Sequence, residues 1–81
     1  MIVRLTERFL ESYKDAPPAV QKAVTKQLRF LEANLKHPSL HAKKYDESQD
    51  LWQARITRDW RLYFFIDGDI YRIYDMEQHP K

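Results

Sequence analysis

The sequence predicts a small α+β fold: a strand, a two-helix hairpin, then a three-stranded antiparallel meander, with both helices packed on one sheet. A change of hydrophobic period predicts it. Apolar residues recur at helical spacing up to Leu35, and after Leu51 they alternate with polar residues as strands do. No repeat, low-complexity tract or linker interrupts this order, so residues 1–81 are expected to form one domain.

The first part of the chain contains one strand and the start of the helical hairpin. Residues 2–5 are predicted to form a short strand, and Thr6 follows as the N-cap of a helix that ends near Lys14. One face of this helix is apolar or aromatic: Phe9, Leu10 and Tyr13. Proline is tolerated in the first turn of a helix, so Pro18 is expected to open the second helix.

The second helix has an apolar face and a basic face. Its apolar face contains residues at helical spacing: Val20, Val24, Leu28, Leu31 and Leu35. Its opposite face contains Lys22, Lys26, Arg29 and Lys36. This basic stripe is either an ordinary solvated face or a contact surface for RNA or an acidic partner peptide. The helix should end before His37-Pro38, and residues 37–50 are expected to be a surface loop.

Two hairpins are predicted in the second part of the chain. If the first turns at Thr57-Arg58-Asp59, Ile56 faces Trp60 and Arg55 faces Arg61. Asp67-Gly68 is a strong signal for the second turn, because a type I′ turn needs positive φ at both centres, and it leads into a strand over residues 69–76.

The register of the second hairpin extends the basic surface. A turn closed on Asp67-Gly68 places Tyr63 opposite Arg72 and Arg61 opposite Tyr74. A third cation and aromatic rings would then share one surface, which can hold a nucleic-acid strand by stacking and phosphate contact.

The paired arginines define the candidate site. Like charges opposed on a sheet are destabilising, and an anion such as phosphate, which a guanidinium binds with two parallel hydrogen bonds, would relieve the repulsion. The alternative is that each arginine extends into water or pairs with an acid such as Asp59 or Asp69. His79 lies beyond the last strand, and imidazole can take or give a proton near neutrality.

Composition and motifs exclude several other classes of protein. The formal charge is +2, cysteine is absent, and neither a signal peptide nor a membrane span is recognised, so a cytoplasmic protein without membrane contact is expected. His37 and His41 do not complete a zinc site, and the glycine loops and nucleophile elbows of other enzymes are missing. We therefore expect no metal and no cofactor.

The segment Leu51–Tyr63 (LWQARITRDWRLY), followed by Ile66-Asp67-Gly68-Asp69-Ile70, resembles the sheet motif of the RelE/ParE toxins. His37-Pro38-Ser39-Leu40 with Lys43-Lys44 is similar to the connector of many members. The resemblance covers essentially the whole chain, because the strand, paired helices and meander come in the order of that family.

The resemblance implies the toxin of a type II toxin–antitoxin pair, and its RelE-like branch enters the ribosomal A site and cuts mRNA without a metal. It implies that Arg61 holds the scissile phosphate, that Arg55 and His79 match further basic or catalytic positions, and that Asp59 matches an aspartate of one histidine-using group. Other residues are expected to help seat RNA: His41, Lys43, Lys44, Arg58 and Arg72. Gln53 departs from members that carry a catalytic lysine there.

The implied partners are a cognate antitoxin, with which the chain would form a hetero-oligomer, and the ribosome with its mRNA. Two alternatives stay open. The ParE-like branch shares the fold and inhibits DNA gyrase without nuclease chemistry, and a third possibility is a non-catalytic co-repressor that acts with its antitoxin. Family membership alone does not choose among them.

Overall fold

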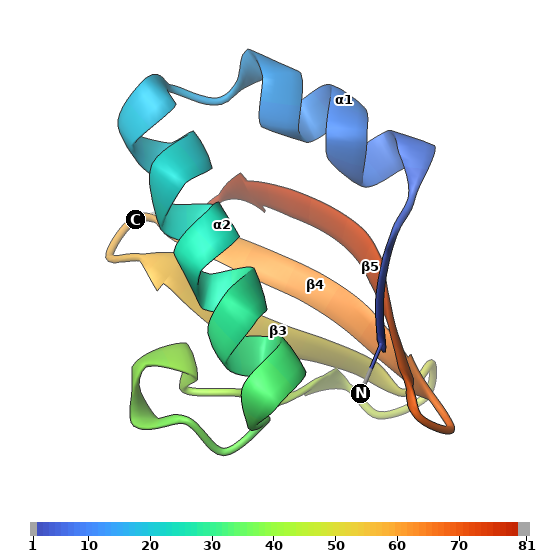
Figure 1. The fold of residues 1–81 in the computed structure, drawn as a ribbon. Coiled ribbons are helices and arrows are strands. Elements are labelled where there is room, and N and C mark those ends of the chain that lie inside the picture. The colour runs from blue at the N-terminus through green and yellow to red at the C-terminus, as the bar shows by residue number, and fades with distance from the viewer. Residues whose placement is uncertain (1, 80–81) are drawn as a thin grey trace.

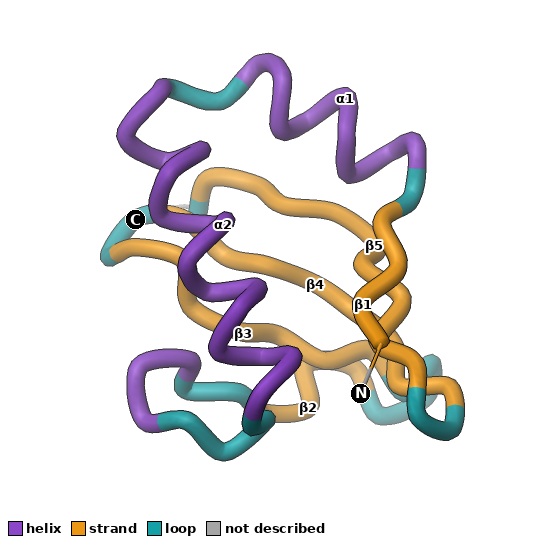
Figure 2. The backbone as a smooth tube through the Cα atoms, viewed as in Figure 1, coloured by secondary structure: helices purple, strands orange, loops and turns teal. Residues whose placement is uncertain are grey.

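The computed structural model describes residues 2–79 and has the α+β architecture predicted from the sequence (Figure 1). A five-stranded sheet has the order β1-β5-β4-β3-β2, and both helices lie on one of its faces (Figures 1 and 2). The elements in chain order are β1 (Ile2–Leu5), α1 (Glu7–Asp15), α2 (Pro18–Ala33), the 3-10 helix η1 (Pro38–Leu40), β2 (Lys43–Asp46), β3 (Leu51–Thr57), β4 (Trp60–Asp67) and β5 (Ile70–Gln78).

Thr6 caps α1, as predicted, and also joins the two ends of the chain. Its Oγ1 accepts a hydrogen bond from the backbone N–H of Phe9 at 3.2 Å. The same hydroxyl donates to the carbonyl oxygen of Ile73 at 2.8 Å and lies 3.1 Å from that of Tyr74. Because β1 pairs with β5 in parallel, one side chain fixes where the first strand ends and where α1 begins.

Helix α2 begins at Pro18 and buries most of the predicted apolar face, including Val20, Val24 and Leu31. Two details differ from prediction. The helix ends at Ala33, so Leu35 lies beyond it, and Gln27 is buried within the apolar face. On α1, Leu10 is largely exposed while Phe9 is buried, because α1 packs mainly against β5.

Residues 37–50 are not a simple loop. They contain η1 and the edge strand β2, which pairs antiparallel with β3, so the meander has four strands instead of three. The sequence of β2 has no alternation of polar and apolar residues that would predict a strand, because both faces of this edge strand are largely exposed.

Two β-bulges and one shifted turn change the predicted pairings. Arg55 pairs with Arg61, as predicted. A bulge follows at once, so Trp60 pairs with Thr57 and not with Ile56. Gly68, with φ of 62°, lies between the paired residues Asp67 and Ile70, which moves the turn one residue later than expected.

The shifted turn and a bulge in the β4–β5 ladder separate the third arginine from the first two. Arg72 pairs with Phe65 and not with Tyr63, and Arg61 pairs with Glu77 and not with Tyr74. The predicted partners of Arg72 and Arg61 were therefore wrong, although Arg72, as the partner of Phe65, still lies on the face of the sheet that carries Arg61.

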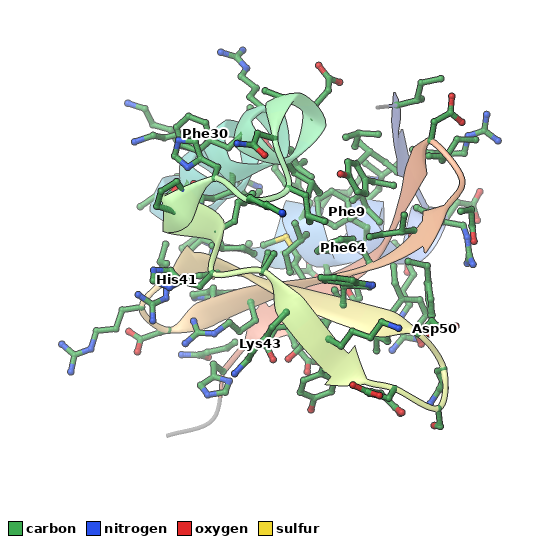
Figure 3. All side chains as sticks on the ribbon, turned by 90° about the horizontal axis from the view of Figure 1, so that it is seen from below. Phe9, Phe30, His41, Lys43, Asp50 and Phe64 are labelled. Carbon is green, nitrogen blue, oxygen red and sulfur yellow. The ribbon has the colours of Figure 1, made fainter. Side chains whose placement is uncertain are left out.

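The core lies between the helices and the sheet, where Figure 3 shows Phe9 and Phe64. Both rings are almost fully buried, and each fully buried apolar side chain of this size contributes about 1.5–3 kcal/mol. The opposite face of the sheet carries no helix of the described chain. Within residues 2–79, neither helix has the length and apolarity that crossing a bilayer requires.

Replacing Thr6 by alanine should lower the free energy of unfolding by about 1–2 kcal/mol, because the N-cap and the bond to β5 are lost together. Urea unfolding followed by circular dichroism measures the change. Thr25→Ala is the control, since Thr25 Oγ1 donates only to the carbonyl of Gln21 on the exposed side of α2. It should change stability by less than about 0.5 kcal/mol, and equal losses would contradict the role of Thr6.

Candidate functional site

A pocket of about 410 Å³ lies where the connector after η1 meets β2, β3 and β4. It is lined by His41, Ala42, Lys43, Gln53, Arg55 and Arg61. Three of these side chains are cationic and none is acidic, so the pocket is strongly electropositive. Figure 3 shows His41 and Lys43 on the same side of the molecule, at the start of β2.

The two arginines of the pocket are cross-strand neighbours. Arg55 and Arg61 are paired residues of β3 and β4, and neither forms an ion pair within residues 2–79. Arg61 is anchored at the β3–β4 turn, where its Nη1 donates to the carbonyl of Thr57 at 2.8 Å and also lies 3.1 Å from that of Arg58 and 3.0 Å from that of Trp60. Its other N–H donors are left for a ligand, and an anchored guanidinium loses less conformational entropy when it binds that ligand.

Glu77 completes a row of charges across three strands. It pairs with Arg61 on β5, so Arg61 lies between a basic and an acidic residue in the ladder, although no ion pair joins Arg61 to Glu77 within residues 2–79. Opposite charges in facing positions contribute about 0.2–1 kcal/mol, which offsets part of the repulsion between the arginines.

The connector that carries His41 is fixed at its start. The ring of His37 stacks on that of Phe30, with centroids 3.9 Å apart, and His37 Nδ1 accepts from the backbone N–H of Ser39 at 3.2 Å. Leu40 is completely buried. His41 then takes a left-handed conformation with φ of 46°, which a non-glycine residue holds only when its surroundings impose it.

Gln27 joins this connector to β3. Its Nε2 donates to the carbonyl of Arg55 at 2.8 Å and to that of Ser39 at 3.1 Å, while its Oε1 accepts from Ser39 Oγ at 3.4 Å. One buried amide of α2 therefore sets the position of the His41 connector relative to the strand that carries Arg55.

Gln53 and Tyr63 lie beside the arginine pair. They are paired residues of β3 and β4, and both are buried although they lie on the face of the sheet opposite the helices. The ring of Tyr45 meets that of Tyr63 edge-on at 5.1 Å. Burial, together with the carboxylate of Glu77, raises the pKa of Tyr63, so its hydroxyl stays protonated and can donate a hydrogen bond at neutral pH.

Asp59 and His79 meet at the end of the β3–β4 hairpin, next to the pocket but outside its lining. The backbone N–H of His79 donates to the carbonyl of Asp59 at 2.6 Å. Asp59 is half-buried in the turn, and its own N–H donates to Thr57 Oγ1 at 3.3 Å. The structure therefore brings His41, and not His79, into the pocket with the arginines.

The remaining basic residues predicted to seat RNA are separated from the pocket or engaged elsewhere. Lys44 Nζ lies 2.7 Å from Asp50, and Arg72 Nε lies 2.9 Å from Asp67 while its guanidinium covers the ring of Phe65. Arg58 is exposed on the hairpin turn. Of the five residues predicted to seat RNA, only His41 and Lys43 line the pocket.

The role of Gln27 and the place of the Gln53 side chain in the pocket lining were not predicted from the sequence. A signal for Gln27 was present, because it stands at helical spacing between Val24 and Leu31 and interrupts an apolar face. A polar residue at such a position usually has a buried partner. Within the described chain, no cluster of three or more His, Cys, Asp or Glu side chains could hold a metal ion.

No protein-family model and no curated protein matches this sequence. Solved structures do match over nearly the whole chain. A chain of the archaeal RelE–RelB complex from Pyrococcus horikoshii superimposes with a TM-score of 0.81 at 15% identity, covering 99% of this chain and 96% of that one. A chain of the YoeB dimer from Staphylococcus aureus superimposes with a TM-score of 0.79 at 16% identity, covering 99% of this chain and 98% of that one. The YoeB/ParE toxin from Agrobacterium tumefaciens superimposes with a TM-score of 0.78 at 12% identity, covering 99% of this chain and 100% of that one.

These matches show that the chain has the fold of the RelE/ParE toxins, as the sequence motifs suggested. At 12–16% identity, the likeness is one of fold. The function of the pocket has to be argued from its own residues.

Replacing Gln27 by leucine should lower the free energy of unfolding by about 1–3 kcal/mol, because two carbonyl groups lose their donor. The amide signals of Ser39 and His41 should also shift in nuclear magnetic resonance (NMR) spectra. Gln21→Leu is the matched control on the same helix, since its Nε2 donates only to the carbonyl of Tyr13. It should leave those signals in place, and a Gln27→Leu spectrum with an unmoved connector would contradict the link.

Proposed function

We propose that this chain is the toxin of a type II toxin–antitoxin pair and that it cleaves mRNA on the ribosome. The observation that carries the proposal is the pocket in which Arg55, Arg61 and Lys43 converge with His41. The fold shared with solved toxins supports the toxin role, and the pocket supports the chemistry.

The cations of the pocket fit a phosphodiester. Guanidinium groups donate parallel hydrogen bonds to non-bridging phosphate oxygens and keep their charge at any physiological pH. During cleavage, negative charge grows on those oxygens as phosphorus becomes pentacovalent. Donors already held in place, as Arg61 is by the turn carbonyls, stabilise this charge with little reorganisation.

RNA provides the nucleophile for the proposed reaction. The ribose 2′-oxygen attacks the adjacent phosphorus, the bond from phosphorus to the 5′-oxygen breaks, and the products are a 2′,3′-cyclic phosphate and a free 5′-hydroxyl. A base must take the proton of the 2′-hydroxyl, and an acid must supply one to the leaving oxygen. Neither a metal nor a cofactor enters these steps.

His41 is the proposed proton-transfer group, because it is the only histidine that lines the pocket. His79 and Asp59, which lie together at the neighbouring hairpin end, are proposed to contact the RNA strand or supply the second proton transfer. The lining of the pocket has three cationic side chains and no acidic one, which favours binding of an anionic strand that depends on salt concentration.

The proposed partner is an antitoxin that forms a hetero-oligomer with this chain in the cytoplasm. Chains of the same fold were solved together with RelB and with YefM in toxin–antitoxin complexes. The basic residues of α2, which form no ion pairs within the described chain, are a suitable surface for an acidic partner.

Arg61→Ala should reduce mRNA cleavage by about 10²–10³, since it removes one pre-positioned donor from the phosphate. Cleavage is measured by mapping mRNA ends by primer extension after induced expression. Arg4→Ala is the matched control, because it removes an exposed strand arginine at the opposite edge of the sheet. Equal cleavage by wild type and Arg61→Ala would refute the proposed role of Arg61, and inhibition of DNA gyrase in a supercoiling assay would assign the ParE-like activity instead.

His41→Ala should slow cleavage by about 10²–10⁴, which is the usual contribution of a positioned acid or base. His79→Ala should slow it less. The pH–rate profile in a ribosome-based cleavage assay tests the assignment, because His41→Ala should remove one limb of the profile. If that limb disappears in His79→Ala instead, His79 is the proton-transfer group.

A further inference from the structure

Gln53 differs from the other buried polar side chains of this protein. Among residues 2–79, three polar or charged residues are at least nine-tenths buried: Gln27, Gln53 and Asp75. Gln27 makes three hydrogen bonds, and Asp75 accepts from Arg8 Nε, Ser12 Oγ and the N–H of Met76 at 2.6–2.9 Å. The amide of Gln53 makes no side-chain hydrogen bond within residues 2–79, although its residue is only 9% exposed.

The free amide opens on the pocket. Gln53 belongs to the pocket lining and lies between Lys43 on β2 and Tyr63 on β4, its two cross-strand partners. No side-chain oxygen or nitrogen in the described chain is completely sealed from solvent without a partner, so the Gln53 amide is reachable from the pocket. Since no side chain of the fold occupies them, both the donor and the acceptor of this amide are free to bind a ligand.

We propose that Gln53 reads the edge of a nucleobase next to the phosphate held by Arg55 and Arg61. A phosphate accepts hydrogen bonds only, so it would leave the Oε1 of Gln53 unpaired. A nucleobase edge offers a donor and an acceptor side by side, which matches a carboxamide. The volume of about 410 Å³ lies within the usual range of small-molecule pockets and suits one nucleotide.

Adenine is the expected base. Glutamine and asparagine bind adenine with two hydrogen bonds, from N6 to the amide oxygen and from the amide nitrogen to N7, whereas guanine is bound more often by arginine. The buried ring of Tyr63, which meets that of Tyr45 edge-on, lies beside Gln53 in the sheet. The proposal rests on the proposed function for its ligand class, and it adds a preference among RNA sequences.

The test is an NMR titration of the wild-type protein and of Gln53→Leu with the 3′-monophosphates of adenosine, guanosine, cytidine and uridine. Wild type should bind 3′-AMP at least about fivefold more tightly than the other three, and the side-chain amide signals of Gln53 should shift. Gln53→Leu should bind all four alike. Gln49→Leu, which changes an exposed glutamine that donates to Asp46, should keep the wild-type pattern.

Thermal unfolding supplies a second readout. Gln53→Leu removes an amide that has no partner in the fold, so its melting temperature should equal or exceed that of wild type, by up to about 4–8 °C. A clear loss of stability would show that the fold itself needs the amide, and it would overturn the proposal.

The remaining outcomes separate this proposal from the proposed function. Equal binding of four nucleotides by wild type, or an equal loss for all four in Gln53→Leu, would overturn base reading even if the protein cleaves RNA. A preference for another base that vanishes in Gln53→Leu would support base reading and overturn adenine. Selective binding by a protein that cleaves no mRNA would support base reading and refute the cleavage activity.

Discussion

The pairing of β3 with β4 determines the positions of Arg55, Arg61, Gln53 and Tyr63. Because side chains alternate along a strand, burying Leu62 and Phe64 under the helices forces Arg61 and Tyr63 onto the opposite face. The same pairing sets Arg55 beside Arg61. A shift of one residue would exchange the two faces, so the apolar core holds two like charges together that would otherwise separate.

Much of the fold was predictable because its signals are local. Thr6, Pro18 and the alternation after Leu51 each act within a few residues, and the structure has the predicted cap, helix start and strands there. The errors come from interactions that no local pattern encodes. A bulge after Arg55 and another beyond Tyr63 each insert one residue into the ladder. The edge strand at residues 43–46 forms because its backbone pairs with the free edge of β3, which requires no particular side chains.

The site was predictable to the extent that it depends on strand pairing. Arg55 and Arg61 are paired as predicted, although the turn is one residue shorter than expected, because the bulge after Arg55 compensates for the difference. The contribution of His41 was not accessible in the same way, because it depends on a left-handed residue and on a connector held by α2 through Gln27. Such contacts join segments far apart in sequence, and a single sequence does not indicate which residues of those segments meet.

The parallel pairing of β1 with β5 has a consequence for biosynthesis. Residues 2–5 are synthesised before the rest of the described chain, yet their partners are residues 70–73, and the hydroxyl of Thr6 needs the backbone of Ile73. Contacts of such long sequence separation form slowly, because the intervening chain must be ordered first. The edge of the sheet can close only after almost all of the described chain has been translated, so this part of the nascent polypeptide stays incompletely folded until residues 70–73 have been made.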